Sequence, residues 1–187
     1  MHQVIVCEFV TVDGVMEDPD GSGGTPWGGW AFRYGPGPVS GDKFGLGTVL
    51  DTGVQLLGRR TWELFAGLFP TRDDEFSTRM NRMAKVVVSR GEPDLDRWSN
   101  STSAQGDAVD IVRDRVATQD VVVLGSGGVV DRLLAAGVVD ELRLMVFPTV
   151  VGRGRRLFGE AALDLDLVAT RDAGAGVLLH TYQRKGA

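Results

Sequence analysis

The sequence has 187 residues, of which 43% are hydrophobic and 24% charged, and its formal net charge is -5 at pH 7. These values are ordinary for one compact globular domain and disfavour disorder, collagen-like repeats and coiled coils. The negative charge also disfavours nucleic acid as the main partner, because phosphate backbones are bound by clustered Lys and Arg, but it leaves an anionic small molecule open.

Cysteine and histidine are too scarce for several kinds of site. Cys7 is the only cysteine, so neither an intrachain disulfide nor a cysteine-based metal site can form. His2 and His180 are the two histidines, and their placement argues against a zinc site or a histidine-based triad. No apolar run approaches the ~20 residues of a membrane helix, and residues 1–9 show no basic leader. We expect a cytoplasmic protein without metal or membrane contact, in which a cofactor carries any chemistry.

The chain starts with a strand and continues into a segment rich in glycine and proline. Residues Gln3–Val12 are mostly apolar and β-branched, and the Asp13-Gly14 pair is a turn signal, which predicts a strand. Residues 18–47 contain ten glycines and four prolines, a density that excludes regular structure over much of the segment. Loops of this length are usually functional or disordered. A short helix is predicted over Asp42–Thr52.

Three apolar runs follow, each ending in a polar or glycine-rich cluster, with helical patterns between or after them. Short runs of this kind are typical of strands that are buried on both faces of a parallel sheet. Strands that alternate with helices predict right-handed crossovers and a mostly parallel sheet covered on both faces. The predicted strands are Val54–Leu57, Lys85–Val88 and Val121–Leu124. The predicted helices are Trp62–Leu68, Glu75–Met83, Asp107–Val116 and Val129–Ala135.

The last third of the chain predicts three further strands. Glu141–Val146 is the first, and a loop rich in Gly and Arg follows at Val150–Arg156. Leu163–Ala169 and Val177–Gln183 are predicted as two strands joined by residues 171–176, and such a closing hairpin gives the sheet an antiparallel edge. No linker or internal repeat divides the chain. We therefore expect one α/β domain over residues 1–187, with a mostly parallel mixed sheet.

The carboxyl ends of the parallel strands are where a ligand is expected, because loops and helix N-termini converge there with unpaired amides. Gly125-Ser126-Gly127-Gly128-Val129 follows a buried strand and opens a helix, so its amides and the helix dipole can seat a phosphate. A side chain would keep the ligand away, which glycine avoids. The spacing fits neither a Rossmann fingerprint nor a P-loop. The alternative is that this turn serves only close packing.

Arginines stand at two other strand ends. Gly58-Arg59-Arg60-Thr61 provides two guanidinium groups and a hydroxyl, and a helix beginning there adds free amides. Ser89-Arg90 ends the next strand along the chain and suits a phosphate monoester, such as the 2'-phosphate that distinguishes NADP from NAD. The alternative for each arginine is an ion pair with a surface acid. Three such strand ends together favour a dinucleotide site.

Motifs spread over nearly the whole chain match one family in sequence order. Gly58–Glu63 resembles the Gly-Arg-x-Thr-Trp/Tyr-Glu motif of dihydrofolate reductases and of the riboflavin-biosynthesis reductase domain, the RibD C-terminal family. Thr11–Gly14 is similar to the Ser-Leu-Asp-Gly of the riboflavin branch, and Val86–Arg90 to its Val-Val-Ser-Arg/Lys strand end. Gly125–Gly128 resembles the Gly-Gly turn of that family. Pro148–Gly154 resembles its Pro-Val-x-x-Gly-x-Gly sequence.

The resemblance implies a dihydrofolate reductase-like three-layer α/β/α fold and an NADPH-dependent reductase, as a stand-alone member of the family. It assigns the cofactor phosphates to Arg59, Arg60 and Thr61. It assigns the adenosine 2'-phosphate to Ser89 and Arg90. It assigns the pyrophosphate and the nicotinamide side of the cofactor to the turn from Gly125 to Val129.

The resemblance also implies residues on the substrate side. Asp13 and the loop after it would border the nicotinamide and the substrate. Trp27 and Trp30 are large apolar rings in the glycine-rich segment with a reason to fold over a ligand, so we expect them, with Phe147, on the substrate side. Asp42 would be the acid that binds the substrate and supplies a proton, and its alternative role is to cap a helix N-terminus. For the two tryptophans, the alternative is that they cap the hydrophobic core.

Two classes of function follow. The first is an enzyme that passes a hydride from NADPH to a C=N or C=O bond of a small heterocyclic substrate, with a proton from Asp42 or from water. Within this class, reduction of 5-amino-6-(5-phosphoribosylamino)uracil is an alternative, although the early loop lacks evident basic residues for a phosphoribosyl group. The second class is a non-catalytic module that binds a nucleotide or a partner protein. We also expect a homodimer in which the apolar C-terminal strands pair across a two-fold axis, as in family members that dimerise.

Overall fold

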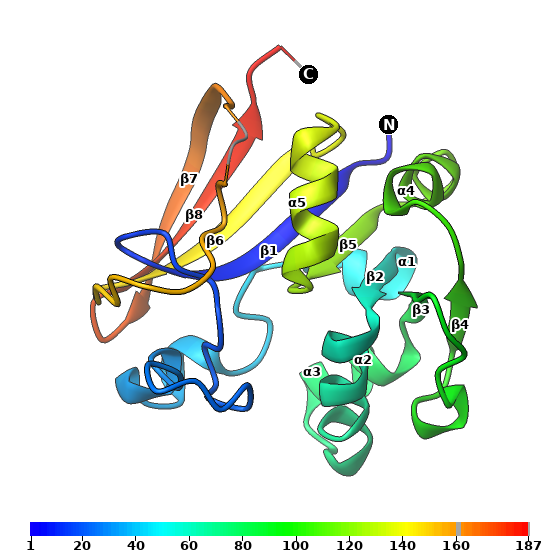
Figure 1. Cartoon of the computed structure of the whole chain (residues 1–187), viewed down its shortest axis with the longest axis horizontal. Coiled ribbons are helices and arrows are strands. Elements are labelled where there is room, and N and C mark those ends of the chain that lie inside the picture. The colour runs from blue at the N-terminus through cyan, green and yellow to red at the C-terminus, as the bar shows by residue number, and fades with distance from the viewer. Residues whose placement is uncertain (160–161, 187) are drawn as a thin grey trace.

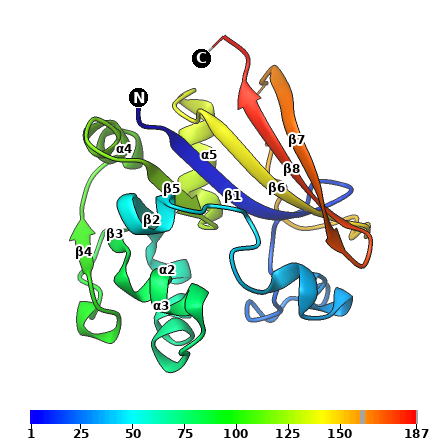
Figure 2. The same ribbon diagram turned by 180° about the vertical axis from the view of Figure 1, so that it is seen from behind.

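The computed structural model describes residues 1–159 and 162–186, and these form one eight-stranded sheet with helices around it (Figures 1 and 2). The strands are β1 (Val4–Thr11), β2 (Val54–Gly58), β3 (Ala84–Val88), β4 (Ser101–Ala104), β5 (Val121–Leu124), β6 (Glu141–Phe147), β7 (Leu165–Gly174) and β8 (Val177–Arg184). Their order across the sheet is β4-β3-β2-β5-β1-β6-β8-β7. The strands from β4 to β6 are parallel, whereas β8 is antiparallel to both β6 and β7.

Helices cover both faces of this sheet and produce three layers. They are α1 (Val49–Thr52), α2 (Arg59–Ala66), α3 (Glu75–Arg82), α4 (Ala108–Val116) and α5 (Gly127–Ala135). α4 and α5 bury Val112 and Val130 in one core, and α5 lies across β1 in Figure 1. The first three helices bury Leu50, Trp62 and Met80 in a second core on the opposite face. No helix in the described part of the chain is both long and apolar enough to cross a bilayer.

The arrangement confirms the predicted fold class, a mostly parallel mixed sheet with an antiparallel C-terminal hairpin. The hairpin differs in detail from the prediction, because most of residues 171–176 belongs to β7. Arg171 pairs with Leu179 in β8, and the turn itself consists of Ala175 and Gly176, whose φ angles are 54° and 78°. Two residues with positive φ form the tight turn that matches the twist of paired strands.

Two other segments depart from the prediction. The predicted helix over Asp42–Thr52 is wrong in its first half, since α1 begins only at Val49. Gly45 and Gly47 have φ angles of 66° and 55°, a left-handed conformation that interrupts a helix. β4 was not predicted, because its sequence Ser-Thr-Ser-Ala lacks the apolar signal of a buried strand and lies at the sheet edge.

Candidate functional site

The carboxyl ends of β2 and β5 lie against each other. The amide of Gly58 donates a hydrogen bond of 2.7 Å to Oγ of Ser126. A Cβ on Gly58 would lie 3.1 Å from this oxygen, and a Cβ on Gly125 would lie 3.4 Å from Cγ2 of Thr61. Gly125 and Ser126 have φ angles of 67° and 72°. The close approach at residue 58 and the backbone conformation at residue 125 therefore both favour glycine.

Both α2 and α5 begin at this junction. Gly58 precedes the first turn of α2 and Ser126 precedes that of α5, and neither helix has a side-chain cap. The first amides of a helix have no partner within it, and the aligned peptide dipoles add partial positive charge there. Because their starting residues share a hydrogen bond, the two helix N-termini lie side by side. This arrangement can bind the two phosphates of a dinucleotide.

The end of β3 lies next to the start of α2. An Nη atom of Arg59 is 3.3 Å from the position that a Cβ on Gly91 would take, and Nε of Arg59 pairs with Glu63 over 2.8 Å. Ser89 is buried and its Oγ accepts the amide of Gly91 over 3.2 Å, whereas Arg90 is exposed. The structure thus brings the Arg59 side chain to the turn that carries Ser89 and Arg90.

An open groove of about 700 Å³ connects this turn with the first turn of α5. Residues on its walls include Ser89, Arg90, Asp107, Gly128, Val129 and Arg132. Arg132, which the sequence analysis missed, forms an ion pair with Asp107. The volume of the groove lies in the range of small-molecule sites. Arg60 is exposed on α2, and its side chain has no hydrogen bond or ion pair within residues 1–159 and 162–186.

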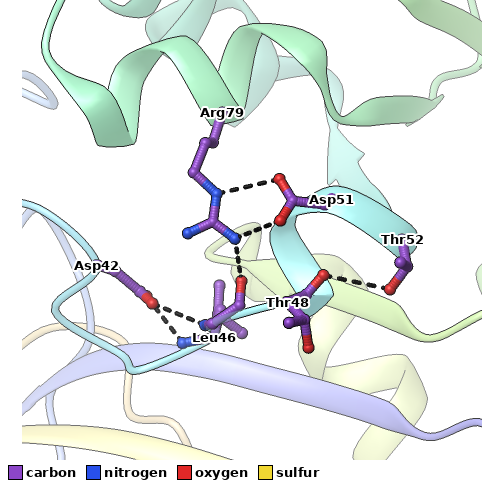
Figure 3. Close-up of polar contacts among 7 residues, drawn as sticks. Asp42, Leu46, Thr48, Asp51, Thr52 and Arg79 are labelled. Carbon is purple, nitrogen blue, oxygen red and sulfur yellow. Dashed lines mark hydrogen bonds and ion pairs between the residues drawn. The ribbon is translucent and has the colours of Figure 1, made fainter.

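Asp42 lies in the long segment between β1 and α1, and α3 packs over this segment (Figure 3). Its two carboxylate oxygens accept the amides of Leu46 and Gly47 over 2.8 and 2.7 Å. Arg79 of α3 holds the same segment, because it pairs with Asp51 over 2.7 Å and donates to the carbonyl of Gly47. The carboxylate therefore caps backbone amides within the loop, and the alternative role of helix N-cap is wrong, because α1 begins only at Val49. Its catalytic role stays a prediction.

Lys43, the next residue, is a candidate that the sequence analysis missed. Its Nζ lies 5.0 Å from the ring centre of Phe76 and 5.7 Å from those of Phe9 and Phe44. Burial lowers the pKa of Lys43 to about 8. An amine that titrates near neutral pH can exchange protons with a ligand.

Asp13 joins the loop after β1 to the loop after β6. Its carboxylate accepts the hydroxyl of Thr11 over 2.6 Å and the amides of Gly152 and Val151 over 2.8 and 3.2 Å. The hydrogen bond from Thr11, together with those from the two amides, lowers the pKa of Asp13 to about 2. Asp13 thus fixes the relative position of the two loops, and its contact with a nicotinamide or substrate stays a prediction.

The aromatic residues assigned to the substrate side lie in two places. Trp30 and Phe147 are fully buried with ring centres 5.4 Å apart, and Nε1 of Trp30 donates to the carbonyl of Glu17 over 2.9 Å. Both belong to the core beneath the glycine-rich loop, which is the alternative stated for Trp30. Trp27 lies beside the loop after β6, where the guanidinium of Arg153 is 5.9 Å from its ring centre. Substrate contacts of all three stay predictions.

Comparison with known proteins finds one family along almost the entire chain. Residues 2–179 match the RibD C-terminal domain. Among curated proteins, the chain is similar to the uncharacterized protein YyaP of Bacillus subtilis (strain 168), with 26% identity over 140 residues. This alignment covers 70% of the present chain and 73% of YyaP.

Solved structures share the fold. A putative riboflavin biosynthesis protein from Shewanella sp. PV-4 has a TM-score of 0.72 and 23% identity, over 98% of this chain and 99% of that chain. A pyrimidine reductase-like protein from Corynebacterium diphtheriae has a TM-score of 0.58 and 12% identity, over 100% and 93%. Dihydrofolate reductase from Enterococcus faecalis, complexed with NADP(H), has a TM-score of 0.57 and 17% identity, over 98% and 96%. The fold is therefore dihydrofolate reductase-like, and the chain belongs to the RibD C-terminal domain family.

Proposed function

We propose that this chain binds NADPH and acts as a reductase, which transfers a hydride to a C=N or C=O bond of a small heterocyclic substrate. The observation that carries the proposal is the gathering of three strand ends, where the N-termini of α2 and α5 adjoin and the guanidinium of Arg59 reaches the turn after β3. Adjacent amides and a guanidinium group suit the negative charges of a dinucleotide. Membership of the RibD C-terminal domain family agrees with a reductase role.

The residues at these strand ends fit NADPH in charge and in space. The first amides of α2 and α5 would hold the pyrophosphate, at the junction where Gly58 packs against Ser126 and Gly125 against Thr61. Arg60 and Thr61 in the first turn of α2 would contact the same phosphates. The adenosine and its 2'-phosphate would occupy the groove of about 700 Å³, which has arginines on its walls.

The chain would contribute positioning and proton supply to the reaction. Bound NADPH would provide the hydride, and the loops after β1 and β6 would align the substrate with it. Asp42 or water would supply the proton. Because both oxygens of Asp42 already accept backbone amides, we favour a water molecule near this carboxylate as the immediate donor.

Replacing Arg59 and Arg90 together by glutamine should weaken NADPH binding about 100-fold and change NADH binding by less than about 3-fold. The reason is that Arg90, together with Arg59 whose side chain reaches the same turn, would donate charge-assisted hydrogen bonds to the 2'-phosphate, a group that NADH lacks. Isothermal titration calorimetry with the two dinucleotides measures both affinities.

A matched control replaces Arg113 and Arg115 by glutamine. Both are exposed on α4 and neither lines the groove, so the variant loses the same charge at another place. It should bind both dinucleotides like the unmodified protein. Equal losses for NADPH and NADH in the Arg59/Arg90 variant would contradict the 2'-phosphate assignment. Failure of the unmodified protein to bind NADPH would contradict the proposed function.

Turnover separates the enzyme from a non-catalytic binding module. We expect oxidation of NADPH, followed by its absorbance at 340 nm, with at least one member of a panel of pterins, flavin precursors and simple carbonyl compounds. The panel includes 5-amino-6-(5-phosphoribosylamino)uracil, which tests the riboflavin-type reaction directly. Tight NADPH binding without turnover on any compound would favour the binding module.

We also propose that the chain forms a homodimer through its hairpin edge. β7 is a ten-residue edge strand that is exposed along most of its length. Leu167 and Val168 of β7 are 56% and 53% exposed, and Leu178 of β8 is 37% exposed. Long edge strands with exposed apolar side chains tend to pair with another strand. Leu167→Lys combined with Val168→Lys should convert a dimer to a monomer in light scattering; an unmodified protein that is monomeric would refute the dimer.

A further inference from the structure

Another arginine lies against the first turn of α5. Arg155 belongs to the loop after β6, and its side chain covers Gly127, where a Cβ would be 3.1 Å from Nε and 3.2 Å from Cζ of the arginine. This turn is also where the proposed pyrophosphate site begins. A guanidinium group is therefore already within reach of an anion bound at the N-terminus of α5.

The guanidinium group of Arg155 is held weakly, whereas the backbone of this residue is fixed by hydrogen bonds. Arg155 forms an ion pair with Asp131, one turn further along α5, and the two side chains are 44% and 42% exposed. Ion pairs with such exposure contribute little to stability. The amide of Arg155 donates to Oε2 of Glu17 over 3.2 Å, and its carbonyl accepts the amide of Met16 over 2.9 Å. The side chain can thus change partner without displacing the loop.

Glu8 provides a second, independent observation beneath the same turn. Its neighbour Cys7 pairs with the last residue of β5, which places Glu8 beside Gly125, on the face of the sheet that α5 covers. Glu8 is 6% exposed, and its Oε1 has no hydrogen-bond partner in the part of the chain that the structure describes. A buried polar atom without a partner is rare in folded proteins and indicates a missing ligand or water.

Burial also sets the charge of Glu8. Burial raises the pKa of Glu8 to about 8, an effect that Arg155 opposes and Asp131 increases. The side chain is therefore a neutral acid at pH 7. A neutral acid can donate a hydrogen bond to a phosphate oxygen, whereas a carboxylate would repel it.

We propose that Arg155 is a phosphate-binding residue that exchanges Asp131 for the pyrophosphate of NADPH, with Glu8 beneath it as a second hydrogen-bond donor. The inference rests on the proposed function, which assigns the pyrophosphate to this turn. The exchange is favourable because a pyrophosphate offers more negative charge and more acceptor oxygens to a guanidinium than one carboxylate does. Asp131 competes for the guanidinium in the free protein, so the carboxylate lowers the affinity for the dinucleotide.

A double-mutant cycle tests the exchange. Arg155→Gln should weaken NADPH and NADH equally, by about 10-fold, because the pyrophosphate is common to both. Asp131→Asn should strengthen the binding of both dinucleotides about 3-fold when Arg155 is present. It should have no effect on binding in the Arg155→Gln background. Calorimetry measures the four affinities. If Asp131→Asn strengthens binding to the same extent in both backgrounds, the carboxylate acts only by its charge and the exchange is wrong.

Two controls locate the effect at the phosphates. Arg153→Gln removes the same charge two residues earlier in the loop, where the guanidinium lies over Trp27, and should change affinity by less than about 2-fold. Inorganic pyrophosphate, measured as a competitor of NADPH, should show the same order of affinities across the Arg155 and Asp131 variants. A different order would mean that Arg155 acts on another part of the dinucleotide, which would overturn the proposal.

The pH dependence of binding tests the part played by Glu8. The charged groups that act on Glu8 are Arg155 from the loop and Asp131 from α5. NADPH affinity of the unmodified protein should fall about 5-fold between pH 7 and pH 9 as Glu8 ionises, and Glu8→Gln should remove this fall. An equal fall in both proteins would overturn the role of Glu8.

The failure of this inference can be told apart from the failure of the proposed function. If the unmodified protein binds neither NADPH nor NADH, the proposed function fails and the inference fails with it. If the unmodified protein binds both dinucleotides and Arg155→Gln binds each of them as tightly as the unmodified protein does, the inference alone is overturned. Circular dichroism of each variant checks that the fold is retained, and the exposed positions of Arg155 and Asp131 favour this result.

Discussion

Replacing Lys85 by methionine should lower the free energy of unfolding by about 3 kcal/mol. Lys85 is 1% exposed on β3, the strand next to the edge strand β4, and its Nζ lies 4.3 Å from the ring centre of Trp98. It donates to three backbone carbonyls, at 3.1 Å for Asn81, 2.6 Å for Met83 and 3.1 Å for Ser99. Methionine has a similar length but no donor, so these carbonyls lose the cation that ties the end of α3 to β3 and to the turn before β4.

Urea denaturation followed by circular dichroism at pH 7 measures this loss. The matched control is Lys185→Met, which makes the same chemical change at an exposed position and should alter the free energy of unfolding by less than about 0.5 kcal/mol. A Lys85→Met protein as stable as the control would show that the desolvation penalty of the buried ammonium group equals the stabilisation from its hydrogen bonds.

Between about pH 5 and pH 8, the unmodified protein should lose stability relative to the Glu8→Gln variant. The pKa of Glu8 is raised by burial from 4.5 to about 8 in the folded chain. Over this range the unfolded chain has ionised Glu8 while the folded chain must keep it protonated, so the unfolded state binds fewer protons. The contribution of Glu8 to stability is therefore full below about pH 4.5 and is lost as the pH rises through about 8.

The difference in free energy of unfolding between the variant and the unmodified protein isolates this effect from other titrating groups. From pH 5 to pH 8.5, the free energy of unfolding of Glu8→Gln should rise by about 3 to 5 kcal/mol relative to that of the unmodified protein, because each unit of pKa shift corresponds to about 1.4 kcal/mol. Denaturation curves at four pH values measure it. A difference that stays constant with pH would mean that Glu8 is ionised in the folded chain.

Most of the sheet could be predicted from local sequence patterns. The runs Val54–Leu57 and Val121–Leu124 correspond to β2 and β5 within one residue, because strands buried on both faces are mostly apolar, although β2 also buries Gln55. The polar strand β4 could not be predicted in this way, since it pairs at the edge on one side only. The helix expected over Asp42–Thr52 is shorter, because Gly45 and Gly47 take a left-handed conformation that interrupts it, and the sequence does not show which glycines do so.

Only part of the candidate site could be predicted from local sequence patterns. Gly58 and Gly125 follow apolar strands directly, so their position at adjacent strand ends could be predicted from the parallel topology. Lys43 and Arg155 could not, because their surroundings depend on contacts between loops far apart in the chain. Lys43 meets Phe9 and Phe76, and Arg155 reaches α5 only because the loop after β6 pairs with the loop after β1. Such contacts leave no periodic signal in the sequence.

A crystal structure of the protein with NADPH decides whether the gathered strand ends bind the dinucleotide. We expect the pyrophosphate against the first amides of α2 and α5, and the 2'-phosphate within hydrogen-bond distance of Ser89 and Arg90. A dinucleotide bound at another face of the sheet, or one whose adenosine lies outside the groove between β3 and α5, would show that these strand ends are not the cofactor site.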